Sequence, residues 1–310
     1  MQEEPQCYDI IGDIHGEADA LVGLLKRLGY ECRSGVWQHP LRKAIFLGDF
    51  IDRGPQQAAV LGVVMPMVQR GHALAVMGNH EFNALAFHTL RKDGEGWLRP
   101  RTNKNLGQHW AFLREYLHRP AALEEALAFF RTLPLWLDLG GLRIVHACWS
   151  AEAMAWLAAH HEGPRLTEGL LHEASEAENE AFRHVETLLK GRELELPGHL
   201  KFKDKDGNER GEIRVRWWDR DAKSYRDAYL GPEQARTAIP EDETHGAHLI
   251  EYDPSAPPVF LGHYWMSGTP APLAANIACV DYSVAKPGGK LVAYQWAGEQ
   301  TLSADHFVWV

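Results

Sequence analysis

Three short apolar segments near the start of the chain each end in a turn that joins glycine to an acidic or amide side chain. The segments span residues 8–11, 44–47 and 73–77, and the turns after them are Gly12-Asp13, Gly48-Asp49 and Gly78-Asn79. Between the segments lie patterns typical of helices, over residues 17–28 and 56–69. Strands that alternate with helices predict a parallel sheet, whose sites lie at the carboxyl ends of its strands.

Helix boundaries can also be placed from the same pattern. Leucines at 21, 24, 25 and 28 recur with helical spacing, and a third helix is expected to begin at Glu81. Pro66 lies inside the second helical pattern, where we expect it to kink or split the helix because proline cannot donate a backbone hydrogen bond.

The alternation of strands and helices breaks after His88. Residues 91–108 contain several glycines and prolines and are expected to form a loop, followed by one helix over 110–131, a strand over 142–145, and two or three helices over 151–190. Residues 197–210 and 219–246 are polar and loop-like. Strands are predicted again at 259–261, 276–281, 290–296 and 307–310, with a hairpin turn at 287–289. We expect one α/β domain over residues 1–310, with two mixed sheets packed face to face and helices outside.

Composition narrows the possible functions. The formal net charge of −10 disfavours a dedicated nucleic-acid-binding protein, which would need a basic face. The apolar runs are shorter than the ~18 residues of a membrane span, and the acidic start of the chain has no apolar signal core. The four cysteines form no CxxC pair, which favours free thiols. We therefore expect a cytoplasmic protein with no membrane partner and no nucleic-acid partner.

Five turns that follow predicted strands carry side chains suited to metal binding. Their sequences are GDIHG from Gly12, GDFIDRG from Gly48, GNHE from Gly78, VHA from Val145 and GHY from Gly262. Any one such turn is more often explained by a capping aspartate or a histidine hydrogen-bonded in the core. Five in succession favour a metal site, and the mixture of carboxylate, imidazole and amide ligands suits Mn, Fe, Zn or Mg.

Two ions ~3.5–4 Å apart share a bridging ligand, and a carboxylate suits that role. Such a pair of ions can activate water and hold a phosphoryl group for attack. The remaining negative charge of the phosphoryl group favours an arginine, whose planar fork of donors matches its oxygens. Arg53 follows Asp49 by four residues and can supply that fork.

This series of turns resembles the calcineurin-like metallophosphoesterases over residues 9–281, and most closely the bacterial branch of the phosphoprotein phosphatases, whose pattern is GDxHG, GDxxDRG, GNHE, HA or HG, and GH. The resemblance implies a four-layer α/β/β/α sandwich with a dinuclear metal site at the strand ends. It also implies direct hydrolysis of phosphate esters by a metal-bound hydroxide, without a covalent enzyme intermediate.

The resemblance also implies a role for each matching residue. Asp13 and His15 would hold the first ion, and Asp49 would bridge both ions. The second ion would be held by Asn79, His146 and His263. His80 would be the general acid, oriented by Asp52, and Arg53 would bind the phosphate. Two divalent ions per chain are implied, with manganese as the first choice and iron, zinc or magnesium as alternatives.

A second phosphate-binding arginine is expected in the segment before the last histidine ligand. Arg214 and Arg216 lie on one face of a predicted strand there, and the resemblance favours Arg216, because in the related nucleotide-cleaving enzymes an arginine lies near an aromatic-rich turn in this segment. Solvated arginines on an edge strand are the alternative. Trp149, Trp217 and Trp218 either stack on a substrate ring or belong to the core.

The substrate remains open at this point. We expect hydrolysis of phosphate monoesters, as in serine/threonine phosphoprotein phosphatases, and keep a symmetrical dinucleoside tetraphosphatase as the alternative. The substrate could be a phosphoprotein, a small phosphomonoester or a nucleotide. A catalytically silent binding module is disfavoured because all six metal ligands are present, together with Asp52 and His80. Residues 91–130 and 151–246 are expected to select the substrate.

Overall fold

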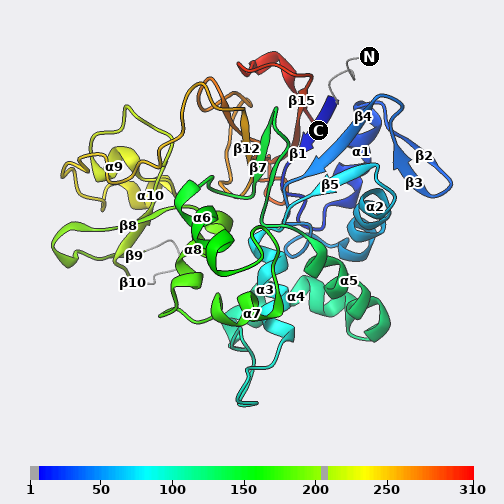
Figure 1. Cartoon of the computed structure of the whole chain (residues 1–310), viewed down its shortest axis with the longest axis horizontal. Coiled ribbons are helices and arrows are strands. Elements are labelled where there is room, and N and C mark those ends of the chain that lie inside the picture. The colour runs from blue at the N-terminus through cyan, green and yellow to red at the C-terminus, as the bar shows by residue number, and fades with distance from the viewer. Residues whose placement is uncertain (1–6, 204–208) are drawn as a thin grey trace.

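The computed structural model describes residues 7–203 and 209–310 (Figure 1). Its larger sheet has the strand order β14 (Asp281–Tyr282), β15 (Lys290–Trp296), β1 (Cys7–Ile11), β4 (Arg42–Phe46) and β5 (Ala73–Ala75), and β16 (Phe307–Trp309) also pairs with β15. Strands β1, β4 and β5 are parallel, and β15 runs antiparallel to β1. The predicted parallel beginning and antiparallel end therefore meet in one sheet.

The smaller sheet has the order β13 (Ile277–Cys279), β12 (Val259–Leu261), β7 (Arg143–Val145) and β6 (Trp136–Asp138). Strand β12 is parallel to both of its neighbours, and β6 is antiparallel to β7. Both sheets are thus mixed, as expected.

Alternating side chains on these strands belong to two different packing layers. Ile10 of β1, Ile45 of β4 and Phe260 of β12 share one buried cluster between the two sheets. Their strand neighbours Ile11 and Phe46 belong to a second cluster that includes the helices. Because both faces of each sheet are covered, consecutive residues toward the carboxyl ends of β1 and β4 are apolar. This packing confirms the prediction of two sheets lying face to face.

Helices α1 (Ala18–Arg27) and α2 (Gln57–Gln69) pack against the larger sheet, at β15 and β5 respectively. Helix α2 continues through Pro66 to Gln69, so of the two predicted outcomes, a kink or a split, the split is wrong. The proline lies in the last turn, where its missing N–H costs one hydrogen bond. Helix α3 (Asn79–His88) starts directly at the turn after β5.

The segment predicted as a loop and one helix contains two helices, α4 (Asn103–Tyr116) and α5 (Pro120–Thr132). Helix α4 begins inside the predicted loop because Thr102 caps it, accepting a hydrogen bond from the Asn105 amide at 3.2 Å. Pro120 starts α5 at a position where its fixed φ favours a helix, which divides the predicted single helix.

The following segment forms three helices, α6 (Ala151–His160), α7 (Glu168–Glu173) and α8 (Glu180–Lys190), within the range predicted. A hairpin of β2 (Glu31–Arg33) and β3 (Val36–Gln38) was not predicted. No helix among the described residues is long and apolar enough to cross a membrane.

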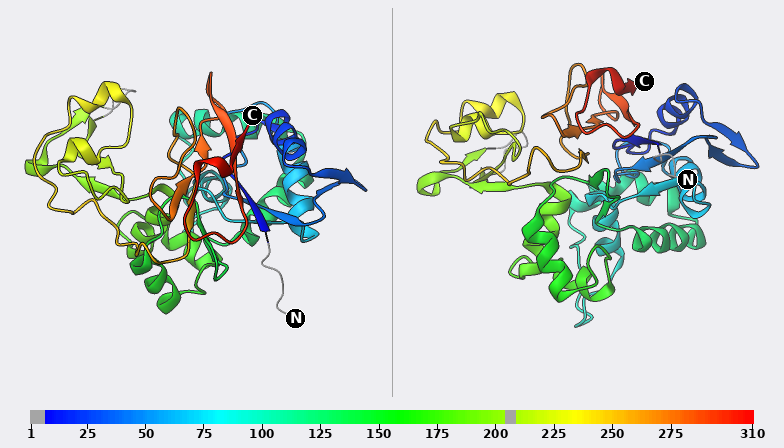
Figure 2. Two further views of the ribbon diagram at one scale, coloured as in Figure 1. Left: turned by 90° about the horizontal axis from the view of Figure 1, so that it is seen from above. Right: turned by 45° about the horizontal axis from the view of Figure 1, so that its top comes forward.

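Residues 193–203 and 209–239 form a side lobe that projects from the body of the molecule in the views of Figures 1 and 2. The lobe was expected to be mostly loop, yet it has its own buried core, which includes Leu196, Ile213 and Ile239. Its elements are β8 (Glu193–Glu195), η1 (Pro197–His199), β9 (Phe202–Lys203), β10 (Glu209–Arg210), β11 (Glu212–Arg214), α9 (Tyr225–Ala228) and α10 (Glu233–Arg236). A further short helix, η2 (Ala304–His306), precedes β16.

Candidate metal centre

The ends of five strands bring together six potential metal ligands. Asp13 and His15 follow β1, and Asp49 follows β4. Asn79, His146 and His263 follow β5, β7 and β12. All six are buried, with at most 8% of their surface exposed. The two sheets therefore contribute ligands to one point, where the strand ends meet.

Asp49 lies at the centre of this cluster. Its Oδ2 is 3.7 Å from Nε2 of His15 and 3.4 Å from Nε2 of His146. Two groups of side chains are spaced closely enough to hold an ion, and Asp49 belongs to both. One comprises His15, Asp49 and His80, and the other comprises Asp49, His146 and His263. A carboxylate shared by two groups is the arrangement that a bridged pair of ions needs.

The second group is completed by an amide oxygen. Oδ1 of Asn79 is 3.2 Å from Nε2 of His146 and 2.8 Å from Nδ1 of His263. The Nδ1 of His146 is 2.6 Å from the carbonyl of Leu47, which fixes the orientation of its ring. A backbone partner on the other ring nitrogen is the usual support of a metal-binding histidine.

Several buried polar atoms at this point have no hydrogen-bond partner in the described part of the chain. They are Oδ1 of Asp13, Nε2 of His15 and Nε2 of His263. Buried polar atoms are normally paired, so three unpaired atoms in one cluster indicate a missing ligand. Carboxylate, imidazole and amide donors together fit a divalent metal ion.

The charge of the cluster also fits cations. Burial, and then Asp281 and Asp49, raise the pKa of Asp13 well above its usual range. Burial, followed by His80, lowers the pKa of His15 to about 3. The carboxyl groups of Asp281 and Asp49 act electrostatically on Asp13, and divalent ions would compensate this concentration of acidic groups.

Glu81, the last residue of GNHE, connects the turn after β4 to the turn after β5 by hydrogen bonds. Its Oε2 accepts hydrogen bonds from the amides of Asp49 at 2.7 Å and Gly78 at 3.1 Å, and its Oε1 accepts one from Phe50 at 2.8 Å. Asp49 has a φ of +50°, a backbone conformation that residues other than glycine rarely adopt without such support. Gly78 is required here, because a Cβ at this position would overlap Asp49 Oδ1.

His80 and Asp52 form a pair beside the cluster. Nδ1 of His80 is 2.5 Å from Oδ2 of Asp52, and Nε2 of His80 is 3.9 Å from Oδ2 of Asp49. Burial lowers the pKa of His80, but Asp49 and Asp52 outweigh it and raise that pKa above its ordinary value. The ring can therefore carry a proton toward the metal cluster.

An open cavity of about 1760 Å³ lies over the cluster and is lined by Asp49, Asn79, His80 and His263. Arg53 and Arg214 also line it, whereas Arg216 does not. Strand β11 ends at Arg214, so the alternation that placed both arginines on one face stops there. The guanidinium of Arg216 instead contacts Asp219 at 3.2 Å and donates to the carbonyl of Asp227.

Trp149, Trp217 and Trp218 are at most 8% exposed and do not line this cavity. Trp265, which the sequence analysis did not single out, does line it. Two cations lie over its ring, with Cζ of Arg53 at 3.9 Å and Nζ of Lys286 at 3.5 Å from the ring centroid. Trp265 follows the GHY turn directly, which is the signal that could have identified it.

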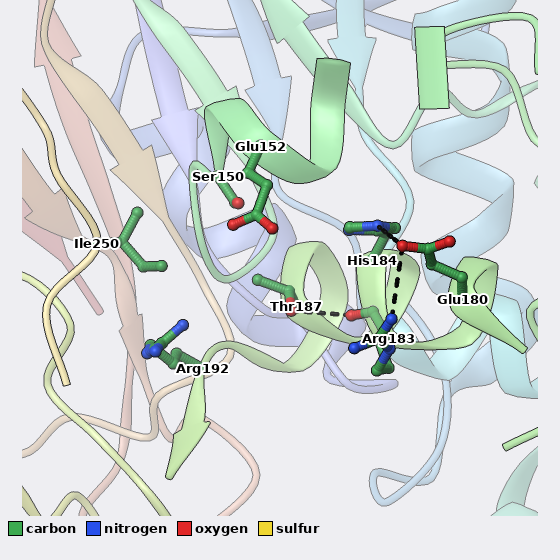
Figure 3. Close-up of a pocket in the computed structure, with 8 residues that line it drawn as sticks. All are labelled: Ser150, Glu152, Glu180, Arg183, His184, Thr187, Arg192 and Ile250. Carbon is green, nitrogen blue, oxygen red and sulfur yellow. Dashed lines mark hydrogen bonds and ion pairs between the residues drawn. The ribbon is translucent and has the colours of Figure 1, made fainter. Parts of the chain in front are cut away.

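A second cavity, of about 260 Å³, lies beside α6 and α8 (Figure 3). Several of its polar side chains interact with residues that also line it. Glu180 pairs with Arg183 at 3.5 Å and with His184 at 3.8 Å, and Thr187 donates to the carbonyl of Arg183 at 2.8 Å. Neither candidate metal-binding group lies there, so the larger cavity is the candidate site.

Two further residues at the site escaped the sequence analysis. Asp281, at the start of β14, accepts hydrogen bonds from the amides of Trp265 at 2.7 Å and Ser283 at 2.9 Å. His109, on α4, has its Nδ1 2.7 Å from Oδ1 of Asp52. Asp281 sits at a strand end, which is a usable signal, whereas no local pattern marks His109.

Residues 8–263 match the family model described as calcineurin-like phosphoesterase. A relative from Geobacillus sp. (strain WCH70), the asymmetrical bis(5'-nucleosyl)-tetraphosphatase PrpE, is 52% identical over 73 residues, which are 23% of this chain and 30% of the relative. The protein of that name from Bacillus subtilis (strain 168) is 42% identical over 75 residues, 24% of this chain and 31% of the relative. The chain thus spans less than a third of the length of these curated relatives.

Solved structures with the same fold cover nearly the whole chain. A protein serine/threonine phosphatase from Saccharomyces cerevisiae, with similarity to human phosphatase PP5, has a TM-score of 0.51 and 14% identity, covering 99% of this chain and 80% of that one. A cold-active protein tyrosine phosphatase has a TM-score of 0.50 and 18% identity, covering 95% of this chain and 77% of that one. At these identities the likeness is one of fold.

Proposed function

The chain belongs to the calcineurin-like phosphoesterase family of metal-dependent hydrolases, and we propose that it hydrolyses phosphate monoesters at a dinuclear metal centre. The observation that carries the proposal is the convergence of five buried candidate ligands on Asp49, beside the hydrogen-bonded pair of His80 and Asp52. Phosphoryl transfer needs charge stabilisation and a donated proton, and this arrangement offers both.

In this proposal Asp13 and His15 would hold one ion, while Asn79, His146 and His263 would hold the other. Asp49 would be shared by both ions. When bound, two divalent ions supply Lewis-acid polarisation of a phosphoryl oxygen and activation of water. Manganese is the first choice, with iron, zinc and magnesium as alternatives, and elemental analysis of the purified protein tests this choice.

The remaining steps are assigned to side chains around the cluster. Arg53 binds the phosphoryl oxygens, and Arg214 takes the place first expected for Arg216, because it lines the cavity and acts electrostatically on His263. As the ester P–O bond breaks, His80 donates its Nε2 proton to the leaving oxygen. Asp52 accepts the Nδ1–H of His80 and so keeps Nε2 turned toward the site.

A dinucleoside tetraphosphate is the second candidate substrate. Trp110 of α4 lines the cavity and is 55% exposed, so a nucleobase can stack on it. The cavity is also larger than a phosphate group alone requires. The partial relatives named as asymmetrical tetraphosphatases support the same candidate. We favour the monoester because the three tryptophans first considered for stacking are all core residues.

One experiment separates these substrates. The metal-loaded protein is assayed in parallel on p-nitrophenyl phosphate, a phosphoserine peptide and diadenosine tetraphosphate, with D49N as the inactive control. We expect a higher kcat/KM for a monoester. A higher kcat/KM for diadenosine tetraphosphate, lost in Trp110→Ala, would establish the nucleotide function instead. Its products then distinguish asymmetrical cleavage (ATP and AMP) from symmetrical cleavage (ADP alone).

A further inference from the structure

His109 connects helix α4 to the turn that carries Asp52. It lies on α4, is 4% exposed, and its Nδ1 is 2.7 Å from Oδ1 of Asp52. The other oxygen of the same carboxylate, Oδ2, is 2.5 Å from Nδ1 of His80. Because a carboxylate can only accept hydrogen bonds, both imidazoles donate from Nδ1 and hold Asp52 between them.

Two donors on the two oxygens define the orientation of the Asp52 carboxylate. The terminal torsion of aspartate is broad, so a carboxylate held by one hydrogen bond can rotate. Because His109 is bonded to Oδ1, rotation of the Asp52 carboxylate about its terminal torsion would break one of the two hydrogen bonds. Oδ2 therefore stays directed at His80, whose Nε2 faces the metal cluster.

Helix α4 is itself held firmly against this turn. Glu115, nearly two helical turns after His109, accepts hydrogen bonds from the amides of Gln57 at 2.7 Å and Ala58 at 3.1 Å. Oε1 of Gln57 in turn accepts the amide of Asp52 at 2.7 Å. Thus α4, α2 and the Asp52 turn form one connected unit, and contacts between α2 and α4 support it.

The surroundings of His109 leave Asp52 as its polar partner. Phe112 stacks on its ring at a centroid distance of 4.9 Å, and Phe87 lies at 5.2 Å. Its Nε2 is buried and makes no hydrogen bond within residues 7–203 and 209–310. An apolar residue of similar size would satisfy this packing equally well, so packing alone does not account for a histidine here.

We propose that His109 is a positioning residue for the Asp52–His80 pair, so that α4 is part of the catalytic framework and does more than select the substrate. The inference rests on the proposed role of His80 as proton donor. Loss of the His109 hydrogen bond leaves the metal ligands untouched but lets the Asp52 carboxylate rotate. The proton donor is then misaligned, and the effect is largest where the leaving group needs a proton.

The test compares His109→Leu, which keeps the bulk, with His109→Asn, whose amide places a donor near the position of Nδ1. Phe112→Leu is the matched control, because it disturbs the same packing without touching Asp52. We expect His109→Leu to lower kcat on phenyl phosphate by about 10- to 100-fold, with a much smaller loss on p-nitrophenyl phosphate. His109→Asn should recover most of the loss. Metal content should be unchanged, and Phe112→Leu should affect both substrates equally.

A double variant separates this inference from the proposed function. In a His80→Asn background, His109→Leu should cause little further loss, because it acts through His80. Equal losses on both substrates, no recovery in His109→Asn, or full additivity with His80→Asn would overturn the positioning role alone. If His80→Asn itself shows no dependence on the leaving group, the acid role of His80 fails and the inference fails with it.

Discussion

The backbone amide of His80 donates a hydrogen bond to Oδ1 of Asp49 at 2.9 Å. This bond joins the carboxylate shared by both candidate metal-binding groups to the residue proposed as the proton donor. The other carboxylate oxygen of Asp49, Oδ2, faces His15, His80 and His146. The Asp49 side chain therefore links the proposed metal binding to the proposed proton donation, and each of these two functions can be tested separately.

Asp49→Asn removes the charge while its amide oxygen can still accept the His80 amide. An amide bridges two cations poorly, so we expect metal content and activity to fall together. Metal content by elemental analysis and the rate on p-nitrophenyl phosphate measure both. Asp9→Asn is the control, since Asp9 is also fully buried but bonds Arg42 away from the site, and it should lower stability while keeping the metal. A variant at Asp49 that kept two ions and a normal rate would refute the shared-ligand assignment.

His80→Asn tests whether this histidine is an acid or a ligand. As the acid, its loss should cost about 10²–10⁴-fold in rate on phenyl phosphate and less on p-nitrophenyl phosphate, whose leaving group scarcely needs a proton. Metal content should be unchanged. The structure makes this measurement informative, because His80 also lies close enough to His15 and Asp49 to bind an ion. Loss of one ion in His80→Asn would show that it is a ligand.

Arg214 and Arg216 form a natural pair for substitution. Arg214→Ala should lower kcat/KM on p-nitrophenyl phosphate by about 10-fold or more, because a charge-assisted contact to phosphate is lost. Arg216→Ala should keep near-normal kinetics and lower only the thermal stability of the side lobe, where Arg216 pairs with Asp219. Steady-state kinetics and thermal unfolding separate the two effects. The reverse kinetic order would restore Arg216 to the site.

Trp265 is expected to support phosphate binding and not base stacking, since two cations, those of Arg53 and Lys286, already lie over its ring. Trp265→Ala should therefore lower kcat/KM to a similar degree on p-nitrophenyl phosphate and on diadenosine tetraphosphate. Trp265→Phe, which retains a ring for Arg53, should recover part of the loss. A loss confined to diadenosine tetraphosphate would instead indicate that a base displaces Lys286 and stacks on the indole.

His88 should make the protein less stable in acid. Burial, and then His109, Arg101 and Arg131, lower its pKa from 6.5 to about 4. In the unfolded chain His88 is therefore protonated below pH 6.5, whereas in the folded chain it is protonated only near pH 4. The folded state thus loses stability relative to the unfolded state as the pH falls from 6.5 to about 4. His88→Gln should show a smaller fall in unfolding free energy between about pH 7 and about pH 5 in urea titrations. An unchanged fall would remove His88 as a cause.

Much of the site could be predicted from local sequence, because each candidate ligand follows a buried strand, and all of them except His146 lie in a turn that contains glycine. A buried apolar run and the turn that ends it are visible within a few residues, and parallel strands bring their carboxyl ends to one edge. Thus Asp13, His15, Asp49, Asn79, His146 and His263 could be identified without coordinates, and the structure places them together.

Other features depend on contacts between distant segments, which local patterns do not record. His109 reaches Asp52 across 57 positions because α4 docks on α2, and nothing in its own neighbourhood marks that docking. Arg214 and not Arg216 faces the cavity because β11 ends after Arg214 and Asp219 holds Arg216 in the side lobe. The candidate ligands and the two-sheet core could be predicted from the sequence, since they follow from short-range patterns. The arginine, the tryptophan and the second histidine that surround the candidate ligands could not be predicted, because long-range packing sets those neighbours.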